Sequence, residues 1–445
     1  MSDISFVQKE QIPPSPPPAS EAGVTKWLRE NLFNGFSGTL LTAISLVAIY
    51  YILSAAVPWL FFGVWSLDTL DPATNPMLSG MENSTLIQRC RVVLEGTGGG
   101  CFAVIDDRWR QLLYGFYPAD QIWRINLAFL LLFVAIAPVL FNAVPRQLFA
   151  FTAVFPFVAY WLIWGGTIWG PISTLAGFAL WYVVFRLIGD RSFVLGLIGG
   201  AFAGIIWWLF IGGAVAGGLS SVLPIGLESV ESRDIGGFTT NFVIGLTSIA
   251  FSLPLGILLA LGRQSNLFII KGICVVFIEF IRGVPLITLL FVASVILAFF
   301  LPPGTNFDLF LRVIIMVTMF SAAYIAEVIR GGLAALPRGQ YEAADAMGLD
   351  YWQAIRLIIM PQALKISIPG IVNVFIGLFK DTTLVSVISM FDMVGFIRGP
   401  LLSSTDWNGI YWELFAFASL LFFIFCYGIS QYSQYLERKL ATDHR

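Results

Sequence analysis

The sequence predicts an all-α integral membrane protein, and three observations lead to this fold class. Hydrophobic residues make up 58% of the 445 residues. Charged residues make up 12%, well below the quarter that is usual in soluble proteins. The apolar residues also come in long runs, and about 20 apolar residues in a helix span the hydrocarbon core of a bilayer. Lipid is therefore the expected solvent for much of this chain.

Composition also excludes some classes of function. A formal net charge of −2, without a basic block, argues against a nucleic-acid-binding protein. The single histidine, His444, and four widely spaced cysteines leave no cluster of ligands for a metal ion. We therefore predict that the chain holds no metal.

The N-terminal part of the chain is predicted to contain about five spans. Residues 1–38 are rich in proline and poor in apolar residues, so we expect a disordered cytoplasmic tail and not a secretory signal. Residues 39–225 form a membrane extension that includes an outer polar loop at about 66–124. The spans of this extension are predicted at residues 39–65, 125–142, 147–166, 171–187 and 193–213.

A second membrane block follows the polar stretch at residues 226–237 and contains five more spans. The apolar run at 267–300 is too long for one straight span, and Gly283-Val284-Pro285 in its middle is expected to kink or tilt it. The spans of this block are predicted at residues 238–261, 267–300, 309–331, 366–390 and 411–435.

The charges of the connections predict that both termini lie in the cytoplasm. Ten spans place the termini on one side, and lysine and arginine favour short cytoplasmic loops. Cytoplasmic termini bring most cations of the short connections inside, and the opposite orientation would move almost all of them outside. These cations include Arg146, Arg186, Arg191, Arg263, Lys271, Arg338, Arg356 and Lys365.

Two cysteines share the predicted outer loop. An oxidising compartment would allow Cys90 and Cys101 to form a disulfide across the glycine run at 98–100. Two free thiols are the alternative, because the sequence does not show how close their Cα atoms come.

The cytoplasmic connection at about 338–362 is predicted to form a compact knob. Residues 340–347 and 351–360 read as two short helices, with a sharp turn at Gly348 between them and an end at Pro361. Charged side chains keep the knob out of lipid, while an apolar face that includes Tyr351 and Trp352 suits insertion into the cleft of a partner.

This knob resembles the coupling loop of ABC importer permeases. Met360 stands where the family has leucine, a swap that conserves volume. The matching positions are Glu342, Ala343, Ala344, Gly348, Ile358 and Pro361.

More of the C-terminal block resembles the polar amino acid subfamily. The similar segments are 278–286, where Val284 replaces a threonine that is usual in the family, 326–332 and 380–384. The resemblance covers about 236–438 and implies the five-helix core of a type I ABC importer permease. The N-terminal extension resembles the larger permease of bacterial importers for general L-amino acids or for glutamate, glutamine, aspartate and asparagine.

The resemblance implies a division of labour among several proteins in the bacterial inner membrane. Two copies of a separate ATPase subunit would bind ATP and Mg, a second homologous permease would complete the path, and a periplasmic amino-acid-binding protein would deliver the L-amino acid. The sequence agrees, because it contains no G-x-x-x-x-G-K-[ST] phosphate loop. We therefore expect a transport subunit that binds no cofactor and is not itself an enzyme. The alternative is a secondary amino acid transporter driven by an ion gradient, which would need no knob.

Ionisable residues inside the spans are the candidates for the substrate path, because they are costly in lipid unless they face a cavity or a partner. Lys380 and Asp381, followed by Thr382 and Thr383, could offer both charges to a zwitterion. Alternatively, Lys380 and Asp381 pair with neighbouring charges to fix helix packing or gating.

Two further pairs of oppositely charged residues are candidates. Within each pair the residues lie three positions apart, a spacing that allows a local ion pair on a helix. They are Glu279 with Arg282 and Glu327 with Arg330. We interpret them mainly as structural or gating pairs. The resemblance also implies that they line the substrate path near its cytoplasmic mouth. Asp392, near the outer end of its span, reads equally well as an interfacial group without a special role.

Overall fold

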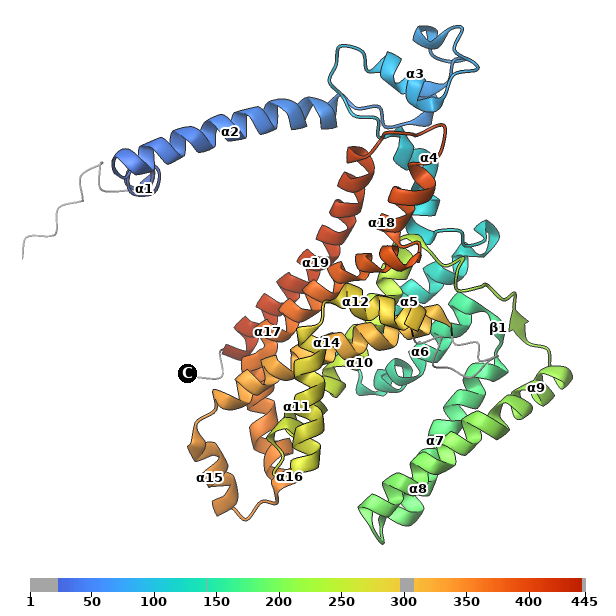
Figure 1. Ribbon diagram of the computed structural model, residues 1–445, viewed down its shortest axis with the longest axis vertical. Helices are drawn as coiled ribbons and strands as arrows, with labels where there is room; N and C mark the ends of the chain where they lie inside the picture. The colour runs from blue at the N-terminus through green and yellow to red at the C-terminus, as the bar shows by residue number, and fades with distance from the viewer. Residues whose placement is uncertain (1–22, 142, 297–307, 442–445) are drawn as a thin grey trace, which may run out of the picture. The chain divides into compact units, whose positions relative to one another are not determined.

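The computed structural model describes residues 23–141, 143–296 and 308–441, and they are mostly helical (Figure 1). The chain divides into two compact units, Met1–Ala103 and Val104–Arg445. The predicted outer loop at 66–124 is therefore shared between the two units.

The first unit contains a long apolar helix and a small polar subdomain. No residue of the apolar helix α2 is buried, as expected for a helix that faces lipid. The subdomain is closed by a disulfide between Cys90 and Cys101, whose Cα atoms are 6.2 Å apart. Arg89 donates hydrogen bonds to the carbonyls of Leu70 and Glu82 there. The helices and turns of this unit are α1 (Gly23–Asn31), α2 (Gly35–Phe61), η2 (Leu67–Leu70), η3 (Pro76–Leu78) and α3 (Leu86–Val93).

The second unit begins with a membrane region that ends in a short antiparallel ribbon. In the ribbon, Gly166 pairs with Leu227 and Thr167 pairs with Gly226. The elements are α4 (Ala103–Tyr114), η4 (Ala119–Gln121), α5 (Ile122–Leu140), η5 (Arg146–Leu148), α6 (Phe149–Trp164), β1 (Gly166–Thr167), α7 (Trp169–Gly189), α8 (Phe193–Ile206), the π turn η6 (Trp207–Ile211), α9 (Gly212–Val222) and β2 (Gly226–Leu227).

The rest of the second unit is a helical bundle with a short helical excursion between α14 and α17. Its elements are α10 (Gly237–Gln264), α11 (Phe268–Gly283), α12 (Leu286–Phe291), the π turn η7 (Val292–Ile296), α14 (Leu309–Ala334), α15 (Arg338–Ala346), α16 (Tyr351–Ala354), the π turn η8 (Ile355–Ile359), α17 (Met360–Asp381), η9 (Thr382–Ile388), α18 (Met393–Phe396), the π turn η10 (Ile397–Leu401) and α19 (Trp412–Ala441).

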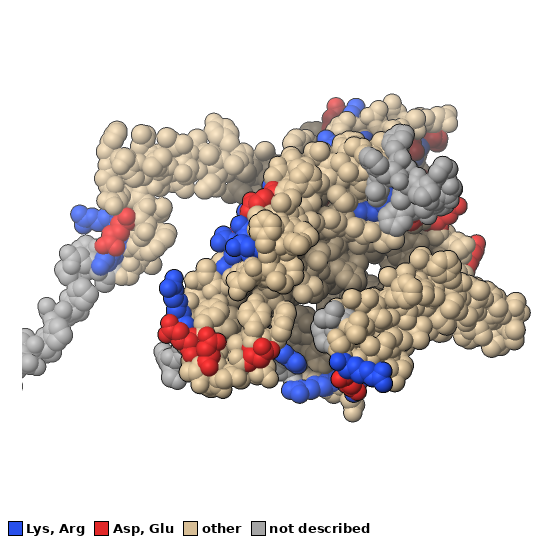
Figure 2. Space-filling model, turned by 60° about the horizontal axis from the view of Figure 1, so that its bottom comes forward, with Lys and Arg blue, Asp and Glu red and all other residues tan. Residues whose placement is uncertain are grey.

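Eight helices of the described residues are long and apolar enough to cross a membrane, and the bent pair α11 and α12 can form a ninth span. The shorter apolar helix at Leu148–Trp164 coincides with the remaining predicted span. Every predicted span thus coincides with a helix in the described residues. Residue 142 of one span and residues 297–300 of another lie outside the described residues. On the face shown in Figure 2, charged side chains form small groups within a largely uncharged surface.

The predicted kink at Gly283-Val284-Pro285 is a sharp break. The axes of α11 and α12 differ by 104° there. Val284 is extended, with φ −110° and ψ 132°, because a proline disfavours helical geometry in the residue before it. A bend this large makes a broken span or a re-entrant loop, and not a tilted straight helix.

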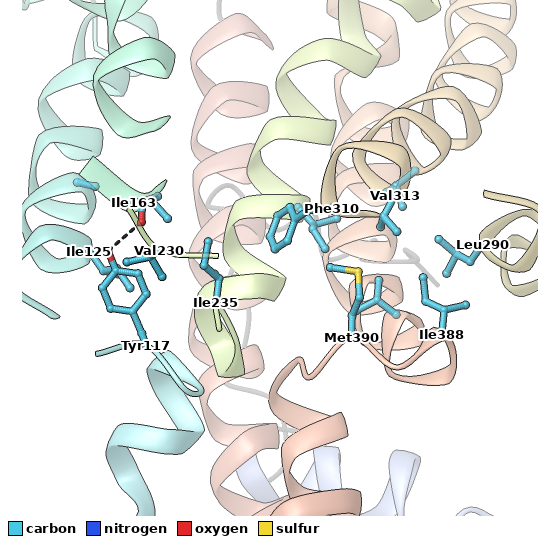
Figure 3. Close-up of a cluster of buried hydrophobic side chains, with 14 of the residues drawn as sticks. Tyr117, Ile125, Ile163, Val230, Ile235, Leu290, Phe310, Val313, Ile388 and Met390 are labelled. Carbon is cyan, nitrogen blue, oxygen red and sulfur yellow. Dashed lines mark hydrogen bonds between the residues drawn. The ribbon is translucent and has the colours of Figure 1, made fainter. Parts of the chain in front are cut away.

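One hydrophobic core joins the N-terminal membrane region to the bundle (Figure 3). Tyr117 and Ile163 belong to the first region, and the Tyr117 hydroxyl donates a hydrogen bond to the Ile163 carbonyl at 2.8 Å. Phe310 and Met390 of the bundle belong to the same cluster. The segments that carry these residues, at 117–128, 162–163 and 230–235, are therefore packed with the bundle.

Glycines let the bundle helices approach closely. A Cβ at Gly256 of α10 would lie 2.6 Å from Ile325 Cγ2 of α14, and a Cβ at Gly245 would lie 2.8 Å from the Phe379 ring of α17. Small residues at such contacts are typical of helix packing in membranes, where close van der Waals contact stabilises association.

Candidate functional site

The predicted knob is formed by α15, a turn and α16, and it lies at one end of the bundle (Figure 1). Gly348 has φ +71°, a conformation that costs residues with a Cβ considerably more than glycine. Its N–H donates to the Asp345 carbonyl at 2.9 Å, which closes the turn after α15. Asp350 and Gln353 then form a capping box that starts α16. The sharp turn expected at Gly348 is present.

The knob presents apolar side chains to its surroundings. Met347, Tyr351 and Trp352 are 64%, 52% and 65% exposed. Glu342 and Ala343 are also exposed, whereas Ala344 is buried. Exposed large apolar groups beside charges are typical of a surface that binds another protein.

The second helix of the knob does not end at Pro361, so that prediction was wrong. The chain stays helical from Tyr351 to Ile388. A proline lacks the N–H that an α-helix needs, but here the π turn η8 directly precedes α17, and Pro361 occupies the first turn of α17. Because the π turn ends just before Pro361, the proline lies in the first turn of α17, where a helix does not need the N–H that proline lacks.

Continuity with α17 fixes the knob to a membrane span. The Gln362 side chain donates to the Gln340 side chain of α15 at 3.0 Å and to the Ile358 carbonyl at 2.9 Å. Ile359 is fully buried and Ile358 is half-buried. A movement of α15 would therefore be transmitted to α17.

A cluster of five charged residues lies near the same end of the bundle. Glu327 of α14 contacts Arg263 of α10 at 2.5 Å and Arg330 at 2.8 Å. Arg282 of α11 is 3.7 Å from the same carboxylate, and its guanidinium lies 5.6 Å from the centre of the Tyr324 ring. The Glu327 side chain is only 15% exposed, so one carboxylate ties three helices together.

One predicted pair of this cluster was wrong. Among the described residues, Glu279 forms no ion pair with Arg282 and instead contacts Arg263 at 3.0 Å. The reason is that α10 lies against both α11 and α14, which places Arg263 between Glu279 and Glu327. The local pair of Glu327 with Arg330 is present. From the sequence, Arg263 served only to orient the spans, and its ion pairs were not predicted. A cation in the last turn of an apolar span is a signal that could have indicated an acidic partner.

The four residues from Lys380 to Thr383 do not share one environment. Lys380 is exposed, Asp381 and Thr383 are half-buried, and Thr382 is fully buried. The Thr382 hydroxyl donates to the Phe379 carbonyl at 2.7 Å and accepts from the Asn241 side chain at 3.0 Å. Thr382 therefore packs helices in this conformation, and Lys380 and Asp381 remain the accessible charges.

Asp392, which the sequence also allowed to have no special role, has a defined role in the structure. It is completely buried, and it accepts hydrogen bonds from the Val394 and Gly395 N–H groups and from Asn241 Nδ2. It thereby caps α18, as Asp commonly does at a helix N-terminus. Burial raises its pKa to about 6. The segment Asp392-Met393-Val394-Gly395 indicates a helix cap by its aspartate. The partner Asn241 lies too far away in the sequence to be predicted from this segment.

Comparisons with known proteins agree with this architecture. Residues 252–442 match the family described as binding-protein-dependent transport system inner membrane component. The chain is 54% identical to the glutamate/glutamine/aspartate/asparagine transport system permease protein BztC of Rhodobacter capsulatus, over the whole of both chains. It is 37% identical to the inner membrane amino-acid ABC transporter permease protein YhdY of Escherichia coli, over 97% of this chain and 96% of that one.

A crystal structure of an amino acid ABC transporter with histidines is also similar, with 30% sequence identity over 45% of this chain and 90% of that chain, and a TM-score of 0.40. The full-length matches, the family match over the bundle and the membrane helices agree with one another. The chain therefore belongs to the inner-membrane permeases of binding-protein-dependent amino-acid ABC transport systems.

Proposed function

We propose that this chain is the permease through which an ATP-driven importer moves glutamate, glutamine, aspartate and asparagine into the cytoplasm. The observation that carries the proposal is the 54% identity to the Rhodobacter capsulatus permease over the whole of both chains. This match includes the N-terminal extension as well as the bundle.

The knob of α15 and α16 is the proposed docking site for a separate ATPase subunit. The exposed Met347, Tyr351 and Trp352 would enter a cleft of that subunit. Two ATPase copies would bind ATP and Mg, because the sequence of this chain has no phosphate loop. A second homologous permease and a periplasmic amino-acid-binding protein would complete the importer, and both termini of this chain would lie in the cytoplasm.

The geometry suggests how docking is coupled to transport. Closure of the ATPase dimer would displace α15, and the bond between Gln340 and Gln362 would pass that movement to α17. The far end of α17 carries Lys380 and Asp381, and Thr382 there is bonded to Asn241 of α10. Rigid elements of this kind can carry a displacement from one end of a bundle to the other.

The test is reconstitution of the complete importer in proteoliposomes. We expect the glutamate-loaded binding protein to stimulate ATP hydrolysis and uptake of labelled glutamate, and competition by glutamine, aspartate and asparagine. Uptake by this chain without an ATPase, driven by an ion gradient, would instead identify a secondary transporter. Stimulation by other amino acids, with no response to these four, would refute the substrate class.

A further inference from the structure

A basic cavity lies beside the knob, at the level where several spans end. Its volume is about 660 Å³. It opens between the end of α10, the start of α11, the end of α14 and α15. Three cations, two other polar side chains and two apolar side chains line it. These are Arg263, Lys271 and Arg330, then Gln264 and Tyr341, and finally Val275 and Ala334.

The charges around this cavity do not balance. No carboxylate lines it, and the two nearest acids, Glu279 and Glu327, already contact Arg263 and Arg330. Lys271 is exposed and forms no ion pair among the residues that the structure describes. The cavity therefore offers a cation that has no partner, beside two guanidinium groups. An anion is the ligand that such a site favours.

The surroundings of Lys271 indicate an amphiphilic anion. On the same helix, Phe268, Ile269 and Ile273 are 88%, 71% and 65% exposed. At about 100° per residue, Phe268 lies roughly 60° from Lys271 around the helix, whereas Ile269 and Ile273 lie roughly 160° from it. The exposed apolar surface therefore begins beside Lys271 at Phe268 and continues around α11. The cavity itself lies where α10 and α14 leave their apolar stretches, which is the depth of lipid headgroups.

We propose that this cavity binds the phosphate headgroup of an anionic phospholipid, with the acyl chains lying along the exposed face of α11. Arg263 and Arg330 can present N–H groups to phosphate oxygens, Lys271 supplies a point charge, and Tyr341 and Gln264 can donate further hydrogen bonds. The expected orientation places the cavity on the cytoplasmic side, where basic pockets between spans meet anionic lipids. Because Tyr341 belongs to α15, the bound lipid contacts the knob as well as the spans.

Retention of phosphatidylglycerol tests the proposal. The complete transporter would be purified from nanodiscs that contain phosphatidylcholine with graded amounts of phosphatidylglycerol, and the lipid that stays bound would be measured by native mass spectrometry. Removing one lysine from a lipid-facing site weakens anionic lipid binding by about fivefold, so Lys271→Gln should bind phosphatidylglycerol about fivefold more weakly. Lys271→Glu should weaken it further. Arg186→Gln, at the end of α7 and outside the cavity, is the control and should bind as the unmodified protein does.

Equal phosphatidylglycerol binding by the unmodified protein, Lys271→Gln and Lys271→Glu would overturn the proposal. Both variants retain the ion pairs of Glu327, so loss of folding is not the expected cause of a change, and an unchanged elution profile in size-exclusion chromatography would verify this. Inorganic phosphate provides the second arm. If it displaces the lipid at equal concentration, and does so only when Lys271 is present, the site takes a free anion and the lipid assignment is wrong.

Discussion

At the scale of single residues, Glu327 is the carboxylate on which the charged cluster depends. It contacts arginines of α10, α11 and α14, and its side chain is 15% exposed. An ionised group in such a place is tolerated only with partners. The cluster therefore helps to hold the three helices together at the end of the bundle where the knob lies.

We predict that Glu327→Gln destabilises the bundle. Removing one partner of a buried ion pair costs about 3–5 kcal/mol, and the partial exposure of Arg330 and Arg282 reduces this to about 2 kcal/mol. The midpoint of thermal unfolding, followed by tryptophan fluorescence of the purified protein, should fall by about 2–4 °C. Glu279→Gln is the matched control, because the Glu279 side chain is 54% exposed. A midpoint as high as that of this control would show that the cluster is not structural.

Asp392 should make stability depend on pH. Its pKa is raised from 3.8 to about 6, chiefly because burial disfavours the charged form. The folded state then binds the proton more tightly than the unfolded state, so stability falls as pH rises from about 4 to about 6 and is then constant. Because of this residue, the free energy of unfolding should be about 1 kcal/mol lower at pH 7 than at pH 5.

The measurement for Asp392 is a denaturant titration at both pH values. Asp392→Asn keeps a side chain that can cap α18 and removes the titration. The difference in unfolding free energy between pH 5 and pH 7 should therefore be smaller in Asp392→Asn, by about 1 kcal/mol. Identical differences in the two proteins would rule out a raised pKa at this residue.

Lys380 is the accessible cation of the predicted substrate path. Hydrogen bonds to charged groups contribute about 1.5–3 kcal/mol, so Lys380→Gln should raise the KM for glutamate uptake at least tenfold if Lys380 binds a substrate carboxylate. Lys365→Gln, near the other end of α17, is the control. Uptake kinetics in proteoliposomes measure the effect. An unchanged KM in an assembled Lys380→Gln complex would leave Lys380 with a role in packing or gating alone.

At the scale of elements, the turn between α15 and α16 depends on one glycine. Gly348 has φ +71°, and a Cβ added there would meet no atom within 4 Å. A side chain would thus fit in space but would strain the backbone. Gly339 of α15 also has open space around it and has no positive φ.

This contrast gives a test of coupling. Gly348→Val should cost about 1–3 kcal/mol in the turn and should reduce substrate-stimulated ATP hydrolysis by roughly tenfold, because the knob loses its shape. Gly339→Val should have a much smaller effect. Both variants should still accept the loaded binding protein, which a pull-down assay can measure. Normal stimulation in Gly348→Val would remove the turn from the coupling route.

The elements were largely predictable because they depend on local sequence. Long apolar runs predicted the spans. Pro285 predicted the break between α11 and α12, because a proline restricts the backbone of the residue before it in any context. The end predicted at Pro361 was wrong because a π turn, which the sequence does not reveal, removes the conflict. The cluster at Glu327 was only partly predictable, since Arg263 lies 64 positions away in sequence and reaches Glu327 only after α10 and α14 pack.

At the scale of the whole molecule, the second unit reaches further toward the N-terminus than the spans alone suggest. The segment at 104–124 has no long apolar run, so the sequence placed it in an outer loop. In the structure, the Asp107 carboxylate accepts a hydrogen bond from the buried Trp407 indole at 2.7 Å, across 300 positions. The Thr239 hydroxyl likewise donates to the Leu113 carbonyl at 2.8 Å. Pairings between residues so far apart leave no local pattern in the sequence.

These contacts predict where the chain can be shortened. A protein that begins at residue 104 keeps all of α4 except its first residue, and it keeps the whole core cluster. It should therefore fold and elute as a single species in size-exclusion chromatography. A protein that begins at residue 236 loses the acceptors of Trp407 and Thr239, and a buried polar group without a partner costs about 1–3 kcal/mol. It also exposes the side of the core cluster that Tyr117, Ile125 and Ile163 cover. The shorter protein should therefore aggregate or unfold at a lower temperature, and equal thermal midpoints of the two proteins would show that the bundle folds without the N-terminal region.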